Sequence, residues 1–262
     1  MRGSLSKGRY SASLLANRLA EVVTLSPAER SLLTNLEQRS EIYAPGSEIS
    51  PAHPRRIQPR LIVSGWAGRQ RMLSNGRCQL LSILLPGDVI GSWEGRRPLD
   101  DETIVAINNV HVISLLPVLG NISNTDVNCG NILPGILHLL RAEEQRIIDS
   151  LVRMGCQTAL ERTANMLLEL HDRCRTIGFV NGDSFIMPLT QEMMANLLGL
   201  SVVHINRIIR LLKSDGSIAV NMGEIRILDR ALLEKHANSI STPLYMVESN
   251  NCVHVSDSRL GH

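Results

Sequence analysis

The 262-residue sequence has no run of eighteen or more apolar residues, the length that a membrane-spanning helix requires. Its first ten residues are polar, and no apolar segment of the kind found in a secretory signal follows them. We therefore expect a cytoplasmic protein with no membrane partner. Hydrophobic residues make up 44% of the chain, which is enough for true cores, and the length suits two domains better than one.

Patterns for metals, cofactors and catalysis are also missing. Five cysteines are scattered without a C-x-x-C pair or a histidine at metal-ligand spacing, so ordinary thiols are expected and no metal or cofactor is predicted. His53 and His111 are candidate haem ligands only in the weak sense that any isolated histidine is. No nucleophile and base, glycine-rich phosphate loop or carboxylate pair stands out, so we predict that the chain is not an enzyme.

Two short helices separated by a glycine are predicted near the C-terminus. Thr190 is suited to cap a helix that continues to about Leu198, and Gly199 supplies a turn. Ser201 then caps a second helix. Apolar residues in that helix recur at i, i+3, i+4 and i+7 and predict one buried stripe of Ile205, Ile208, Ile209 and Leu212.

The opposite face of the second helix is basic, and no acidic residue occurs from Ser201 to Lys213. Residues 217–220 and 224–228 are β-prone and are joined by Asn221-Met222-Gly223, which predicts a hairpin. Helix, turn, helix and hairpin in this order indicate a winged helix-turn-helix over residues 156–238, which would read double-stranded DNA in the major groove. The alternative is a helical hairpin packed in a core, with a basic face that is only solvated. The predicted DNA-binding residues are Thr190, Gln191, Ser201, Val202, Val203, His204, Asn206, Arg207, Arg210 and Lys213.

Two of these residues have a predicted base partner. Arg207 is the best candidate for a bidentate contact with guanine, and Asn206 could pair with adenine.

The first half of the chain has a different pattern. Residues 11–23 form a plausible amphipathic helix, and Ser26-Pro27-Ala28-Glu29 is a capping box that opens a second one. From Glu41 to about Leu116, short β-prone runs alternate with turn dipeptides such as Pro45-Gly46. We predict a small β-roll with flanking helices over residues 11–130.

A long helix is predicted between the two halves, over residues 131–155. Six apolar residues and Glu144 are spaced alternately by four and three, which is a heptad seam of about three repeats and is best explained as a homodimer contact. Glu144 is a polar residue in the seam that could fix its register. Packing of this stripe on the chain's own β-roll is the alternative. Gly155 is predicted to be a hinge before a further helix, and residues 239–262 to be a disordered tail. The predicted dimer interface is Leu133, Leu137, Leu140, Glu144, Ile147, Leu151 and Met154.

These features resemble the cyclic-AMP receptor protein and FNR (Crp/Fnr) family of bacterial transcription regulators over roughly residues 20–236. The resemblance rests on residues 62–66 (IVSGW), residues 85–91 (LPGDVIG), the long helix, and residues 201–207 (SVVHINR). It implies an α+β protein with a cyclic-nucleotide-binding-like β-roll (jelly roll), a dimerisation helix and a winged helix-turn-helix. It also implies a homodimer that binds a near-palindromic site, with RNA polymerase as a candidate partner.

The sequence departs from the family where its ligands bind. Ser92-Trp93-Glu94 stands where cyclic-nucleotide binders have Gly-Glu, and the acidic pair Asp101-Glu102 would repel the phosphate. No cysteine precedes Cys78, so the iron–sulfur cluster of the FNR branch is not expected. Val202-Val203 replaces the family's Arg-Glu pair, while Arg207 is kept. We therefore expect a different target sequence, no response to cyclic AMP, and an effector that remains unknown.

Two interpretations stay open at this point. One concerns an arginine-rich segment, residues 55–77, which forms either a solvated basic face or a site for an anionic ligand or acidic partner. Its arginines are Arg55, Arg56, Arg60, Arg69, Arg71 and Arg77. The other is that the chain is a winged-helix interaction module, or a regulator whose DNA binding depends on an unidentified effector or protein partner.

Overall fold

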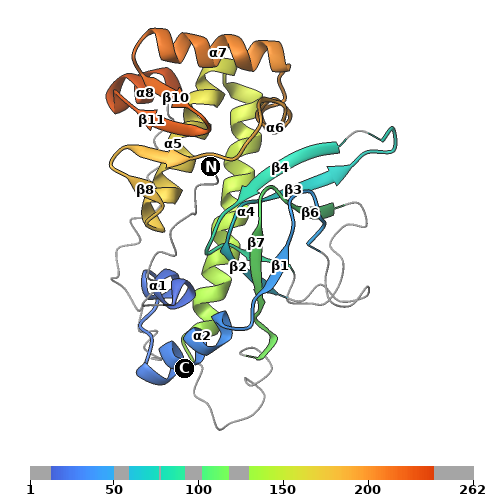
Figure 1. The fold of residues 1–262 in the computed structure, drawn as a ribbon, viewed down its shortest axis with the longest axis vertical. Coiled ribbons are helices and arrows are strands. Elements are labelled where there is room, and N and C mark those ends of the chain that lie inside the picture. Colours follow the sequence, from blue (N-terminus) through green and yellow to red (C-terminus); the bar gives the residue numbers. More distant parts are fainter. Residues whose placement is uncertain (1–12, 50–58, 77, 92–101, 118–129, 239–262) are drawn as a thin grey trace, which may run out of the picture.

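The structure is a computed structural model, and it describes residues 13–49, 59–76, 78–91, 102–117 and 130–238. One long helix, α4 (Ile132–Cys156), runs through the height of the molecule (Figure 1). The β-roll lies along one side of α4, two short helices lie at its base, and a second α+β unit lies at its top (Figure 1). The predicted α+β fold class is confirmed, because strands fill the first half of the chain and a helix-turn-helix lies in the second.

The β-roll consists of two antiparallel sheets. One has the strand order β1-β7-β2-β5 and the other the order β4-β3-β6. Gly65 begins the turn between β2 and β3 at φ +86°, and a Cβ there would lie 2.2 Å from the Asn109 carbonyl oxygen, so this turn requires glycine. The strands are β1 (Glu41–Tyr43), β2 (Arg60–Ser64), β3 (Ala67–Met72), β4 (Cys78–Leu84), β5 (Val89–Ile90), β6 (Glu102–Ala106) and β7 (Val110–Ser114).

Two N-terminal helices, α1 (Leu14–Ala20) and α2 (Pro27–Glu37), pack at the base of α4. The predicted capping box of α2 is present: Ser26 accepts from the Glu29 amide, and Glu29 accepts from the Ser26 amide. The first helix is shorter than the predicted 11–23, because the Glu21 cap ends it after Ala20.

The second unit contains α5 (Ala159–Thr176), α6 (Gln191–Leu198), α7 (Val202–Ser214), α8 (Arg230–Ala237) and one sheet of order β10-β11-β9-β8. Its strands are β8 (Val180–Asn181), β9 (Ser184–Ile186), β10 (Ile218–Asn221) and β11 (Glu224–Ile227). The hinge predicted at Gly155 is wrong. Helix α4 continues through Gly155 to Cys156, and the chain turns at Gln157 because Thr158 forms a capping box that starts α5.

A single apolar cluster joins the two halves. Trp66, Ile83 and Leu85 of the β-roll are buried in the same cluster as the core of α5, α6 and α7. The β-roll therefore packs directly against the second unit. Within the described part of the chain no single helix is long and apolar enough to cross a membrane, although the bent pair α6 and α7 passes the same test by length and composition only.

Candidate nucleic-acid interface

Helices α6 and α7 meet at an angle of 102°, as the two helices of a helix-turn-helix do. Each begins at the predicted cap: Thr190 Oγ1 accepts from the Met193 amide at 3.1 Å, and Ser201 Oγ accepts from the His204 amide at 3.2 Å. Gly199 ends α6 in the left-handed conformation at φ 64°, which glycine adopts at little cost. The local sequence thus fixes both the start of α7 and its direction.

One stripe of α7 is buried and the other faces solvent. Ile205, Ile208 and Leu212 are buried against α6 and the sheet, as the periodicity predicts, and Ile209 is partly buried. Arg207, Arg210 and Lys213 are exposed. None of the three forms an ion pair with any residue that the structure describes. Their charges are therefore available to an external anion.

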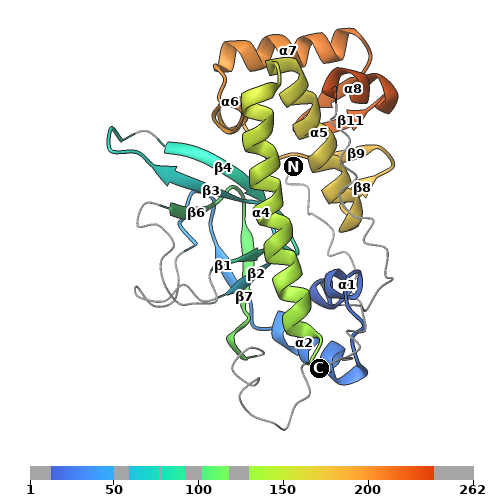
Figure 2. The ribbon, with the colours of Figure 1, turned by 180° about the vertical axis from the view of Figure 1, so that it is seen from behind.

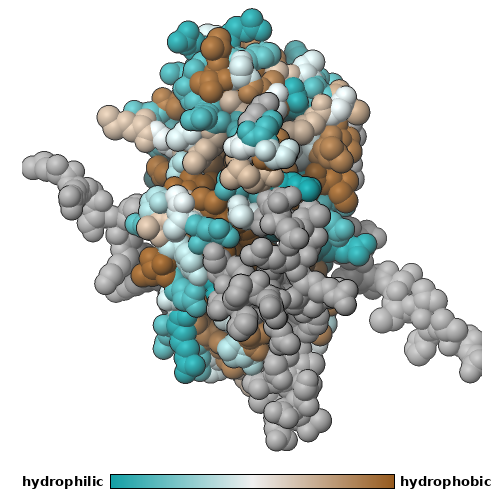
Figure 3. Space-filling model, turned by 90° about the vertical axis from the view of Figure 1, so that its right-hand side faces the viewer, coloured by the Kyte–Doolittle hydropathy of each residue, from teal (hydrophilic) through white to brown (hydrophobic). Residues whose placement is uncertain are grey.

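Helix α7 lies across the end of the molecule farthest from α1 and α2 (Figure 1). Figure 3 shows this end as mostly hydrophilic, with hydrophobic residues between the hydrophilic ones. Val203 has 79% of its surface exposed and Val202 has 39%, whereas His204 and Asn206 are half-buried at the margin of the face. Thr190 and Gln191 are exposed at the start of α6. Eight of the ten predicted DNA-binding residues are therefore exposed, and the other two, His204 and Asn206, are half-buried.

The predicted wing is a two-residue hairpin. Asn221 pairs with Glu224, and Met222 and Gly223 between them have φ values of 46° and 83°. Positive φ at both central positions is the geometry of a type I′ turn, which suits the twist of a hairpin. Met222 is fully exposed at its tip.

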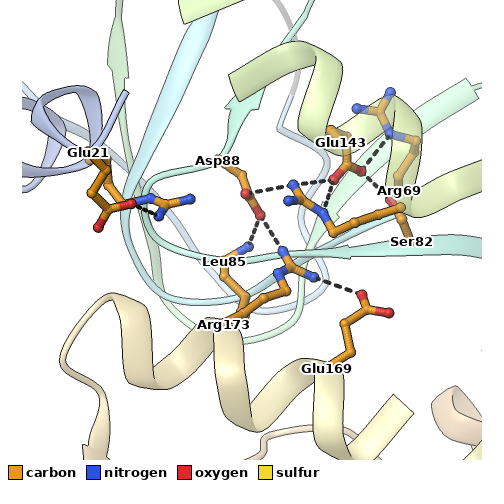
Figure 4. Close-up of polar contacts among 10 residues, drawn as sticks. Glu21, Arg69, Ser82, Leu85, Asp88, Glu143, Glu169 and Arg173 are labelled. Carbon is orange, nitrogen blue, oxygen red and sulfur yellow. Dashed lines mark hydrogen bonds and ion pairs between the residues drawn. The ribbon is translucent and has the colours of Figure 1, made fainter. Parts of the chain in front are cut away.

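A buried carboxylate, Asp88, connects the β-roll to helices α4 and α5. Asp88, at the rim of the β-roll, accepts from Arg146 of α4 at 2.9 Å and from Arg173 of α5 at 2.5 Å (Figure 4). It also accepts from the Leu85 amide at 2.7 Å. Burial alone raises the pKa of Asp88, but the charges of Arg173 and Arg146 outweigh burial and hold the pKa below its usual value.

A second connection joins the edge of the roll to α6. The Asn196 side chain donates to the Cys78 carbonyl at 2.7 Å and accepts from the Leu80 amide. Gln79 donates to the Asn196 carbonyl at 2.7 Å. Because β4 is an edge strand, Asn196 satisfies backbone groups that a neighbouring strand would otherwise pair. The helix-turn-helix is thus held against the roll by hydrogen bonds as well as by apolar packing.

The predicted heptad residues lie outside the buried face of α4, but only some of them face solvent. The buried face of α4 is a different one, Ile132, Gly135, Ile136, Leu139, Ala142 and Glu143. Leu151 is 70% exposed and Leu137 49%, whereas Leu133 and Leu140 are partly packed on the cluster at the base of α4. Glu144 is exposed and Ile147 is half-buried. Met154 is 38% exposed and its Cε lies beside the Gly199 turn. Seen from behind, α4 lies in front of the strands (Figure 2).

Two of the described arginines in the arginine-rich segment lie close to carboxylates of the chain itself. Arg60 is buried, with its side chain 3.4 Å from Glu41, and it donates to the Tyr43 hydroxyl at 2.6 Å. Arg69 lies 3.7 Å from Glu143, which is buried on α4. Arg60 and Arg69 therefore contribute to contacts within the chain, and the role of the segment as a whole stays a prediction. Arg55, Arg56 and Arg77 lie outside the described residues, as do His53, Ser92-Trp93-Glu94 and the predicted tail, residues 239–262.

The described residues contain no group of three or more histidine, cysteine, aspartate or glutamate side chains placed to hold a metal ion. His111 is half-buried and lies 3.4 Å from the Ser40 hydroxyl. Sequence reasoning missed Asn196 and Glu143, and it read Asp88 only as part of a turn motif. The contacts Asp88–Arg146, Glu143–Ser82 and Asn196–Cys78 join residues that are 58, 61 and 118 positions apart along the chain, so no local pattern could reveal them.

Comparison with known proteins bears on this geometry. Residues 161–236, which contain α6, α7 and the wing, match the model of the Crp-like helix-turn-helix domain. The chain is 25% identical over 196 residues to the nitrogen fixation regulation protein FixK of Azorhizobium caulinodans, which covers 74% of this chain and 77% of that protein. The chain therefore carries a Crp-like helix-turn-helix domain, and it is similar to Crp/Fnr regulators over about three quarters of its length. The transcriptional activator protein FnrL of Cereibacter sphaeroides is 26% identical over 162 residues, 61% of this chain and 64% of that one.

Solved structures of the Crp/Fnr family share the fold. FixK2 from Bradyrhizobium japonicum superposes with a TM-score of 0.63 at 22% identity and covers 75% of this chain and 95% of its own. A CRP/FNR family regulator from Thermus thermophilus superposes with a TM-score of 0.58 at 20% identity, over 77% and 99% of the two chains. The resemblance that the sequence motifs suggested is therefore confirmed.

Proposed function

We propose that this protein is a transcription regulator that binds double-stranded DNA sequence-specifically, as a homodimer on a near-palindromic site. The observation that carries the proposal is the outward face of α7, where Arg207, Arg210 and Lys213 are exposed and have no internal carboxylate partner in the described part of the chain. A helix with such a face fits the phosphate-lined major groove. The relatives' names, nitrogen fixation regulation protein and transcriptional activator protein, support regulation of transcription.

Each residue of the face has a proposed role. Arg207, one turn into α7, donates to both acceptors of a guanine, and Asn206 pairs with an adjacent adenine. Arg210 and Lys213 lie further along the helix, where its axis leaves the groove, and they contact phosphates. Thr190, Gln191 and Ser201 stand at the N-termini of α6 and α7, where backbone amides and hydroxyls contact phosphates and fix the orientation of the protein.

The dimer follows from α4. The exposed Leu137 and Leu151, together with the half-buried Ile147, offer a coiled-coil contact to a second copy. A two-fold dimer then presents two α7 helices to two half-sites. RNA polymerase is the further partner that regulation of transcription would require. The alternative is a regulator whose two α7 helices reach the DNA only after an effector or protein partner has adjusted the contact between the β-roll and the helix-turn-helix.

The dependence of DNA binding on salt tests this proposal. Each phosphate that the protein neutralises releases counterions, so the logarithm of the binding constant should fall linearly with the logarithm of salt concentration. Removing the three charges in Arg207→Ala/Arg210→Ala/Lys213→Ala should reduce the steepness of that line and abolish most binding. A control that removes two charges at the far end of the molecule, Arg30→Ala/Arg39→Ala, should leave both the slope and the affinity nearly unchanged. Equal binding by the two variants would contradict the proposed surface.

A further inference from the structure

The first turn of α7 carries an exposed apolar side chain on the same face as the basic Arg207. Val203 is the second residue of the helix, and 79% of its surface is open. No buried cluster includes it. Single exposed valines are common on protein surfaces and carry no meaning by themselves. The exposure of Val203 is significant because of its position: the N-terminal turn of a recognition helix is the part that reaches base edges.

Val203 and Arg207 lie on the same face of α7, four residues apart. With a rise of about 1.5 Å per residue, their Cα atoms are separated by about 6 Å along the helix axis. Base pairs are stacked about 3.4 Å apart. Val203 therefore faces a base pair about two steps from the guanine that Arg207 contacts.

The chemistry of the groove leaves one partner for such a side chain. A valine neither donates nor accepts a hydrogen bond, so it would leave the donors and acceptors of guanine, adenine and cytosine unpaired. The C5-methyl group of thymine is the apolar feature that unmodified base pairs present in the major groove. Contact between two apolar groups removes both from water and is favourable.

We propose that Val203 is a specificity-determining residue that reads the C5-methyl group of a thymine in each half-site, about two base pairs from the guanine contacted by Arg207. This inference rests on the proposed function and adds the base that the first turn of α7 selects. Val202 is the weaker candidate, because only 39% of its surface is exposed and it lies 100° away around the helix.

The test compares thymine with deoxyuracil, which pairs identically and lacks only the methyl group. The site is first selected from random DNA, and binding is then measured by fluorescence anisotropy with deoxyuracil at the assigned position of both half-sites. The wild type should lose about fourfold in affinity per half-site, the value of one buried methyl group. In Val203→Ala the thymine and uracil sites should bind nearly alike, because the side chain that touches the methyl group is gone.

Two further variants sharpen the result. Leu211→Ala removes another exposed apolar side chain of α7, eight residues further along and 46% exposed, and it should keep the preference for thymine. Val203→Glu places a carboxylate that accepts from the amino group of cytosine, so the preferred base at that position should change from thymine to cytosine.

The outcomes separate this inference from the proposed function. If wild type and Val203→Ala respond equally to uracil, Val203 does not read the methyl and the inference is wrong, while sequence-specific binding through Arg207 stands. If no sequence is selected by folded protein, the proposed function fails first. Circular dichroism confirms folding of the variants, and the exposure of Val203 makes a loss of folding unexpected.

Discussion

At the scale of single residues, Arg207 and Lys213 illustrate two ways in which one helix binds DNA. They share the exposed face of α7, but Arg207 lies in its first half and Lys213 one residue before its end. The first is expected to contact a base edge and the second a phosphate, and the two contacts make different predictions for sequence preference.

Replacing Arg207 with alanine should lower the affinity for the preferred site by about 1–3 kcal/mol and relax base choice at one position. Lys213→Ala should weaken binding to all sequences alike and reduce the salt slope by about one, because one phosphate is no longer neutralised. Anisotropy titrations against the site and its single-base variants measure both. The role assigned to Arg207 is wrong if the two variants weaken binding equally across unrelated DNA.

Replacing Asp88 with asparagine should lower the stability of the protein. Asparagine at this position keeps the shape but leaves Arg146 and Arg173 without their shared carboxylate, and breaking a buried ion pair in this way lowers the free energy of unfolding by about 3–5 kcal/mol. Denaturation with urea measures the loss. Asp183→Asn, at an exposed position, is the control and should have little effect.

The ion pairs of Asp88 also predict that the effect of Asp88→Asn on stability depends on pH. The pKa of Asp88 is lowered in the folded protein, so its contribution to stability is fully present above the unfolded pKa, about 3.9, and is lost as pH falls through the lower folded value. The difference in unfolding free energy between wild type and Asp88→Asn should therefore be constant near neutral pH and shrink below about pH 4. A difference that instead vanished between pH 5 and pH 7 would contradict the assigned ion pairs.

At the scale of elements, the edge strand β4 and helix α6 are joined by one amide side chain. Asn196→Ala removes two hydrogen bonds to the backbone of β4 and should lower the free energy of unfolding by about 1–3 kcal/mol, because the Leu80 amide and Cys78 carbonyl lose their partner. Hydrogen exchange should accelerate in β4 and hardly change in β10 and β11. Uniform acceleration of both sheets would mean that Asn196 supports the whole fold and not this junction.

Local chemistry explains which elements could be predicted from the sequence. The caps Ser26, Thr190 and Ser201, the left-handed Gly199 and the hairpin turn at Gly223 act within a few residues, so their patterns identify α2, α6, α7 and the wing. The hinge expected at Gly155 failed because helix propensity alone does not end a helix. Helix α4 ends one residue later, at Cys156, and the capping box at Thr158 then starts α5.

Contacts between distant segments could not be predicted in this way. Asp88 and Asn196 look ordinary in the sequence. They matter because each lies where the β-roll contacts the helical part of the molecule. The arginine-rich segment shows the same limit. Its charges suggested an external anion, yet Arg60 and Arg69 face carboxylates contributed by β1 and α4.

At the scale of the whole molecule, α4 runs from the cluster at its base to the helix-turn-helix at its top (Figure 2). The exposed Leu137 and Leu151 on α4 predict the dimer. Leu151→Glu should convert the dimer to a monomer, because Leu151 is 70% exposed and a charge in a coiled-coil seam is strongly unfavourable. Sedimentation velocity measures the change. Ile42→Glu, at a position 67% exposed on β1, is the matched control and should remain dimeric. A dimeric Leu151→Glu variant would refute the seam.

The central claim is that two α7 helices of a homodimer read a near-palindromic site. In vitro selection from a random double-stranded DNA library, with purified protein at moderate salt and no added small molecule, tests it most directly. The account predicts a two-fold symmetric consensus whose half-sites are centred about 34 Å apart, one turn of DNA. Recovery of no consensus, or of one without two-fold symmetry, from protein shown to be folded and dimeric would contradict it.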